Sequence, residues 1–168
     1  MAQKTTPDQS DPVAILQALR SKILALNPHE LGFKPEEEHP TVWGVLMELT
    51  RPEEVVTLTA LVDGTTSLYF STGGGVLGSG NHASVGKAAR QMTAVGELAL
   101  EYTRPVRRYP LPTPGNIRFY LLTFHGVHTV EYQETDLQNG QHALSALYFT
   151  GQDLITQVRL VSEKKDPG

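Results

Sequence analysis

A glycine-rich run, Ser71-Thr72-Gly73-Gly74-Gly75-Val76-Leu77-Gly78-Ser79-Gly80, is the part of the chain best suited to binding chemistry. Its Gly73–Gly78 portion matches the pattern G-x-G-x-x-G, and a helix is predicted to begin directly after it. Glycines let a backbone approach an anion closely, and a helix N-terminus offers free N–H groups and a positive dipole end. The pattern therefore offers a candidate ligand-binding turn made of Gly73, Gly74, Gly75, Gly78, Ser79, Gly80, Asn81, His82 and Ser84.

The sequence around this run does not support a nucleotide cofactor. A dinucleotide fingerprint needs a parallel βαβ unit and an acidic residue after the next strand, about 20 residues on, whereas Glu97 falls inside the predicted helix. Gly86-Lys87-Ala88 lacks the Ser or Thr after lysine that a P-loop requires. We expect no cofactor. We expect the glycines to shape a bent exit from the strand, with Ser79 or Asn81 capping the helix, and anion binding by this turn is the alternative.

The titratable and nucleophilic residues form no recognisable catalytic or metal-binding set. His82 and Ser84 are two positions apart on the predicted helix, so their side chains do not face each other. The chain has no cysteine, which excludes thiolate chemistry. The other histidines fall in or beside predicted turns and loops, without the spacing of a metal motif: His29, His39, His125, His128 and His142. We therefore expect no catalytic residues and no metal ion.

Two charged segments are interpreted as solvated connections. Glu36, Glu37 and Glu38 lie in a proline-flanked loop, and carboxylates that act as acid and base need a pocket instead. Residues 104–115 form a proline-rich linker that carries Arg104, Arg107, Arg108 and Tyr109. Contact between these arginines and an acidic surface is the alternative for that linker.

Composition narrows the classes of partner. The 168 residues are 39% hydrophobic and carry a net charge of −4, which suits one domain but not a generic nucleic-acid binder. No stretch reaches the ~18 consecutive apolar residues of a membrane span. The first ten residues are polar and lack the apolar run of a signal peptide. We expect a cytoplasmic protein that binds neither nucleic acid nor membrane.

Hydrophobic periodicity predicts a single α+β domain over residues 11–162, between disordered tails at 1–10 and 163–168. Asp11 and Pro12 predict the start of a first helix, which ends at Asn27-Pro28 and turns Gln17, Arg20 and Lys22 away from its apolar face. The other predicted elements are strands at 41–50, 55–62 and 66–71, a helix at 81–102, strands at 116–124 and 127–133, and a helix at 143–160.

The predicted strands form an antiparallel sheet, a three-strand meander plus a hairpin, with helices on one face. In the first strand Trp43, Val45, Met47 and Leu49 are expected to share a face. The order of the predicted elements is α-βββ-α-ββ-α. A doubly wound α/β fold is excluded, because it requires strands and helices to alternate along the chain.

This element order resembles the type III secretion chaperone-like fold, whose members are small, acidic, dimeric and noncatalytic. The run 71–85, together with Gly140-Gln141-His142, also resembles uncharacterised bacterial proteins of similar size. A profilin-like or roadblock-like domain is the alternative fold, with two strands before the middle helix. The resemblance implies a noncatalytic homodimer. Because the sequence shows no catalytic set but predicts strand edges and helices rich in small residues, we expect a binding or scaffold domain that recognises a protein or peptide through its sheet or helix face. The competing hypothesis is a small-anion-binding protein or enzyme that uses the turn at residues 73–80.

Overall fold

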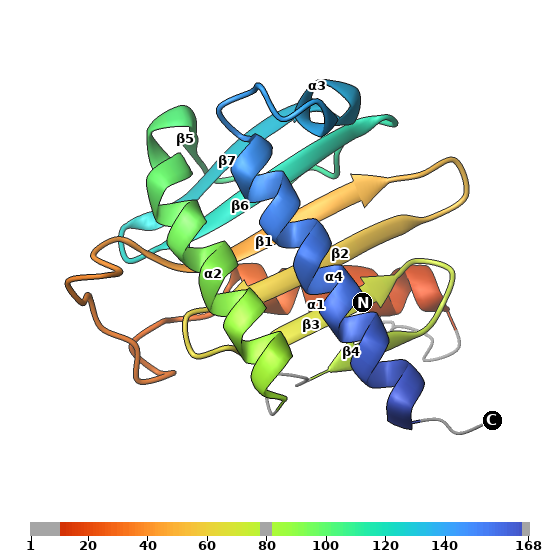
Figure 1. Ribbon diagram of the computed structural model, residues 1–168, viewed down its shortest axis with the longest axis horizontal. Coiled ribbons are helices and arrows are strands. Elements are labelled where there is room, and N and C mark those ends of the chain that lie inside the picture. Colours follow the sequence, from red (N-terminus) through yellow and green to blue (C-terminus); the bar gives the residue numbers. More distant parts are fainter. Residues whose placement is uncertain (1–10, 78–81, 166–168) are drawn as a thin grey trace, which may run out of the picture.

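A computed structural model describes residues 11–77 and 82–165 of the chain, and the structural statements below refer to these residues. Within them, seven strands form one antiparallel sheet in the order β4-β3-β2-β1-β6-β7-β5 (Figure 1). The strands are β1 (Val42–Thr50), β2 (Val55–Leu61), β3 (Thr66–Phe70), β4 (Gly75–Leu77), β5 (Arg104–Val106), β6 (Asn116–Thr123) and β7 (Gly126–Gln133). The helices are α1 (Pro12–Leu24), α2 (Ala83–Ala99), α3 (Glu134–Gln138) and α4 (Ser145–Lys165), with a 3-10 turn at Leu100–Tyr102.

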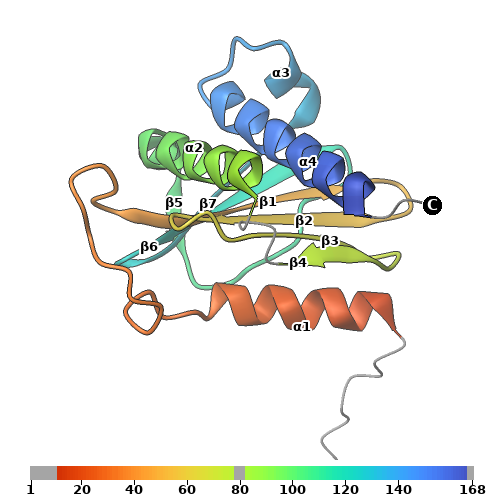
Figure 2. The same ribbon diagram turned by 60° about the horizontal axis from the view of Figure 1, so that its bottom comes forward.

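The α+β class and the antiparallel meander are confirmed, but the placement of helices on one face only is wrong. Helices α2 and α4 lie side by side on one face of the sheet, whereas α1 covers the other face (Figure 2). The sheet is therefore the middle of three layers. Because both faces of β1 are covered, Val42 through Leu49 are all buried, as in strands that lie between two layers.

The larger core lies between the sheet and the pair α2 and α4. Its buried side chains include Val45 and Met47 of β1, Phe119 of β6, Met92 of α2 and Leu154 of α4. A smaller cluster on the α1 face holds Leu24, Trp43, Leu46, Leu61, Tyr120 and Leu122. Trp43 was expected beside Val45 and Met47, and this prediction is wrong. The pairing of β1 with β6 shifts register between Val42 and Gly44, which turns Trp43 to the α1 face.

The structure adds three short elements that the sequence interpretation treated as loops. Strand β4 extends the sheet beyond β3, and β5 pairs with β7 from within the stretch interpreted as a solvated linker. Helix α3 replaces the start of the predicted polar turn at 136–141. Its Glu134 is buried, ion-paired with Arg51 of the β1–β2 turn, and accepts a hydrogen bond of 2.8 Å from the Tyr148 hydroxyl.

Helix α1 starts where the sequence predicts. The Asp11 carboxylate accepts a hydrogen bond of 3.0 Å from the Val13 N–H, and Pro12 occupies the first turn. Along the helix, the prediction that Arg20 points away with Gln17 and Lys22 is wrong, because Arg20 is buried against the sheet while the other two are exposed. Among the described helices, none has the length and apolar character needed to cross a membrane.

Candidate functional site

The glycine-rich run does not lead straight from β3 into a helix. Gly73 and Gly74 have φ angles of +112° and +89° and form the turn between β3 and β4. Glycine suits this turn because other residues rarely adopt such angles. Gly75 then opens β4 and pairs with Tyr69. A Cβ at Gly75 would stand 2.8 Å from the Leu68 carbonyl oxygen, so the absence of a side chain lets β4 approach β3.

The structure separates Gly73, Gly74 and Gly75 from the start of α2. A Cβ at Gly73 would lie 3.6 Å from Pro12 Cγ, which places this turn beside the start of α1. Helix α2 instead approaches the other end of β3, where Gly64 packs against Gly86. His82 is the N-cap residue of α2 without a side-chain capping bond, and Ser84 is exposed. Gly78, Ser79, Gly80 and Asn81 lie outside the described residues.

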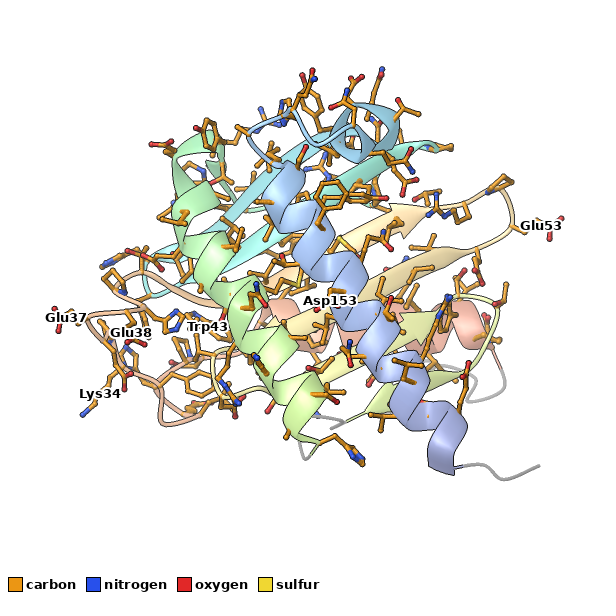
Figure 3. All side chains as sticks on the ribbon, in the orientation of Figure 1. Lys34, Glu37, Glu38, Trp43, Glu53 and Asp153 are labelled. Atoms are coloured by element: carbon orange, nitrogen blue, oxygen red, sulfur yellow. The ribbon has the colours of Figure 1, made fainter. Side chains whose placement is uncertain are left out.

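The histidines and acidic residues stay dispersed. Across residues 11–77 and 82–165, no group of three or more histidine and acidic side chains has the arrangement of a metal site. His142 accepts a hydrogen bond of 3.1 Å from the Leu144 N–H at the start of α4, and its ring lies 3.9 Å from that of Tyr132. Glu36, Glu37 and Glu38 are exposed on the loop between α1 and β1, and Figure 3 shows Glu37 and Glu38 pointing away from the sheet.

A buried ion pair joins α1 to the centre of the sheet. The Arg20 Nε–H donates to both carboxylate oxygens of Glu48 at 2.8 and 3.0 Å. Arg20 is 6% exposed and Glu48 is fully buried. The Thr57 hydroxyl donates to the same carboxylate at 2.7 Å from the neighbouring strand. Charged groups this deeply buried require partners, and each of these has one.

The ion pair extends into a network that holds the segment between β5 and β6. Arg20 Nη2 donates to the Pro110 carbonyl at 3.2 Å, and the Tyr120 hydroxyl donates to the same oxygen. The guanidinium carbons of Arg20 and Arg118 lie 5.4 and 5.8 Å from the centre of the Tyr120 ring. Burial raises the pKa of Tyr120 to about 12, against the opposing effect of the two arginines, so the phenol remains a donor at neutral pH.

Several arginines lie close together where the segment between β5 and β6 contacts β6. Arg104, Arg107, Arg108 and Arg118 line one cavity of about 270 Å³ together with Val106 and Pro110, and we call it the arginine pocket. It lies on the α1 face, because Arg118 stands directly opposite Glu48 across β6 and β1. Arg104 reaches the pocket through the pairing of β5 with β7.

The four side chains differ in how they are held. Arg118 is mostly buried, donates to the Thr129 hydroxyl at 3.0 Å and forms an ion pair of 3.4 Å with Glu131. Arg104, Arg107 and Arg108 are exposed and form no ion pair within the described part of the chain. The pocket therefore combines one fixed cation with others that are available to a ligand. Its chemistry favours carboxylates or other flat anions.

A neighbouring cavity of about 460 Å³ shares Arg104 and Arg118 with the arginine pocket. Glu101 and Glu131 also line it, together with Tyr102. Their carboxylates oppose binding of an anion on that side. The potential for anion binding is therefore concentrated on the side of Arg107 and Arg108.

The sequence interpretation missed the buried pair and the pocket. Glu48 was the residue from which the buried ion pair could have been predicted, because it is the only charged residue in the apolar run from Val42 to Leu49. A carboxylate at such a position requires a buried cation, but the chain contains many basic residues and nothing local selects Arg20. Arg118 is likewise a charged residue within a mostly apolar predicted strand, which indicates that it has a specific partner or role.

In comparisons with known proteins, the chain matches no protein-family model, and no curated protein or solved structure matches it significantly.

Proposed function

We propose that this chain is a noncatalytic binding domain that recognises an acidic segment of a protein partner through the arginine pocket. The observation that carries the proposal is the convergence of Arg104, Arg107, Arg108 and Arg118 on one cavity in a chain of net charge −4. Such a local concentration of positive charge in an acidic protein marks a surface that attracts anions.

The guanidinium groups that line the pocket favour a peptide carboxylate as ligand. A guanidinium presents a planar set of donors that matches a carboxylate in two parallel hydrogen bonds. Strand β5 forms the edge of the sheet, so an extended segment can lie along it while its side chains reach Arg107 and Arg108. The bonds from Arg20 and Tyr120 to the Pro110 carbonyl hold the intervening segment in place. This preorganisation lowers the entropic cost of binding.

A labelled peptide of alternating glutamate and glycine tests this proposal by fluorescence anisotropy. We expect the Arg107→Glu/Arg108→Glu double variant to weaken binding roughly 10- to 100-fold, because two attractive contacts become repulsive. Binding to the unmodified protein should also weaken as salt rises, since the exposed arginines are screened. Circular dichroism should remain native, because both side chains are exposed.

The matched control is Lys87→Glu/Arg159→Glu, which reverses two exposed charges on α2 and α4, on the opposite side of the sheet. It changes the net charge by the same amount and should leave peptide affinity within about twofold of the original. Equal losses in both double variants would mean that only net charge matters, and the proposed pocket would then be wrong.

We also propose that a second copy of this chain packs against the outer side of α2 and α4. Apolar side chains there are exposed: Leu98 by 76%, Phe149 by 46% and Leu160 by 47%. Phe149 and Leu160 are eleven positions apart, close to three helical turns, and therefore lie on one side of α4. Large apolar side chains that are exposed in this way are available to contact a second copy of the chain.

Size-exclusion chromatography with light scattering measures this association. We expect twice the mass of one chain at micromolar concentration, and the mass of a single chain for Leu98→Glu/Phe149→Glu. A monomer at high micromolar concentration would reject the homodimer and leave the arginine pocket unaffected.

The alternative of an anion held by the glycine-rich run gains no support from the described geometry, since Gly73–Gly75 and α2 meet opposite ends of β3.

A further inference from the structure

A second cavity on the α1 face lies between α1 and strands β2 and β3. Its volume is about 270 Å³, and its walls are mainly apolar, formed by Leu19 and Ile23 of α1, Leu26 just after this helix, and Leu61 of β2. It shares no lining residue with the arginine pocket. The two cavities can therefore be tested separately.

The sheet side of this cavity carries hydroxyl groups with unmet hydrogen-bonding capacity. Thr59 of β2 stands directly opposite Ser67 of β3, and both residues line the cavity. They are 4% and 6% exposed, and neither side-chain oxygen has a hydrogen-bond partner among the described residues. A buried hydroxyl without a partner is destabilising, because it has lost its hydrogen bonds to water and gained none in return. A ligand that bonds to these oxygens recovers the free energy lost in this way.

Two further polar groups lie at the same cavity. Tyr69 lines it, and burial raises the pKa of this phenol, so it is a neutral donor at physiological pH. Lys22 lines it from the last turn of α1, is exposed, and forms no ion pair within residues 11–77 and 82–165. The cavity thus combines apolar walls and neutral hydroxyl groups with one cation at its solvent side.

We propose that this cavity binds a medium-chain monocarboxylic acid, with its hydrocarbon chain between α1 and the sheet and its carboxylate held by Lys22 and the cavity's hydroxyl groups. Apolar walls with a few placed polar groups are typical of small-ligand sites. A water molecule occupies about 30 Å³ of liquid, so the volume equals that of about nine waters. An acid with about eight carbons has a comparable number of heavy atoms, and octanoate is therefore the probe.

Calorimetric titration with octanoate tests the proposal. Thr59→Val keeps the shape of the side chain and removes its hydroxyl, and we expect affinity for octanoate to fall about fivefold. The free energy of unfolding of the unliganded variant should be equal or higher, since an unsatisfied buried oxygen is removed. A purely structural hydroxyl would give the opposite pattern, with lower stability and unchanged binding.

Lys22→Gln tests the end of the ligand that carries the charge. Octanoate should bind about three- to fivefold more weakly to this variant, whereas 1-octanol, which lacks the charge, should bind equally to both proteins. Lys87→Gln on the other side of the sheet is the control and should change neither affinity.

Leu19→Trp fills the cavity from α1 and should abolish binding of both probes. No saturable heat with octanoate up to its solubility, or equal binding to the Leu19→Trp variant, would overturn the proposal. The acidic-peptide titration has an independent outcome, since the arginine pocket retains all of its lining residues in these variants.

Discussion

Replacing Arg20 with methionine should lower the free energy of unfolding by about 3–5 kcal/mol, because the fully buried Glu48 then loses its ionic partner. The Thr57 hydroxyl would remain as a donor to that carboxylate, but one neutral hydrogen bond does not replace a charged one. Methionine fills a similar volume, so the loss reports the charge and its hydrogen bonds rather than a cavity. Denaturant unfolding followed by the fluorescence of Trp43 measures the change.

Two companion variants isolate the ion pair. Arg20→Met/Glu48→Leu removes both charges and should recover most of the stability, because apolar replacements of buried pairs are often neutral or stabilising. Lys22→Met alters an exposed basic residue on the same helix and should shift stability by less than about 0.5 kcal/mol. A loss below about 1 kcal/mol for Arg20→Met would show that the pair does not hold α1 to the sheet.

Gly96→Val should lower the free energy of unfolding by about 1–3 kcal/mol, because it forces α2 away from the sheet. A Cβ at Gly96 would stand 2.7 Å from Val45 Cγ2, and the branched Val45 side chain is fully buried and cannot move aside. Gly96→Ala introduces the same Cβ and should also destabilise, although alanine gains about 1 kcal/mol of helix propensity over glycine.

Ala94→Gly provides the reference for that propensity. Ala94 is exposed on the same helix, so this change alters the backbone preference without touching the sheet. It should cost about 1 kcal/mol, which sets the gain expected for the reverse change at Gly96. A Gly96→Ala variant stabilised by that full amount would contradict the close approach of α2 to β1.

The strands and helices that the sequence predicted are those with strong periodicity. The apolar alternation of residues 55–61 and the helical spacing of Val85, Met92 and Ala99 each carry their own local signal. Strands β4 and β5 have three residues each, too few for a period to show, and they exist because β3 and β7 offer free edges. The position of Trp43 depended on a register shift that no local pattern encodes.

The candidate site also could not be predicted from local sequence patterns. Arg104, Arg107 and Arg108 are close in sequence, so the sequence alone groups them. Arg118 joins them only through the pairing of β5 with β7 and of β7 with β6. Arg20 and Glu48 are separated by 28 positions and meet because α1 crosses the sheet. The G-x-G-x-x-G match suggested a binding turn, but its first two glycines, Gly73 and Gly74, form the hairpin turn between β3 and β4. Local spacing describes side chains that are neighbours along the chain, whereas this site depends on contacts between elements.

Mapping an acidic peptide by nuclear magnetic resonance tests the central claim that the arginine pocket is the binding surface. On titration of isotope-labelled protein with the glutamate-rich peptide, we expect the largest chemical-shift changes in the backbone amides in and next to the arginine pocket. These are the amides of Arg104, Val106, Arg107, Arg108, Tyr109 and Arg118. The amides along the exposed side of α4 should remain unchanged. Saturating shifts confined to this surface, and lost in the Arg107→Glu/Arg108→Glu variant, are the predicted result. Shifts centred on any other surface, or none at millimolar peptide, would contradict the account.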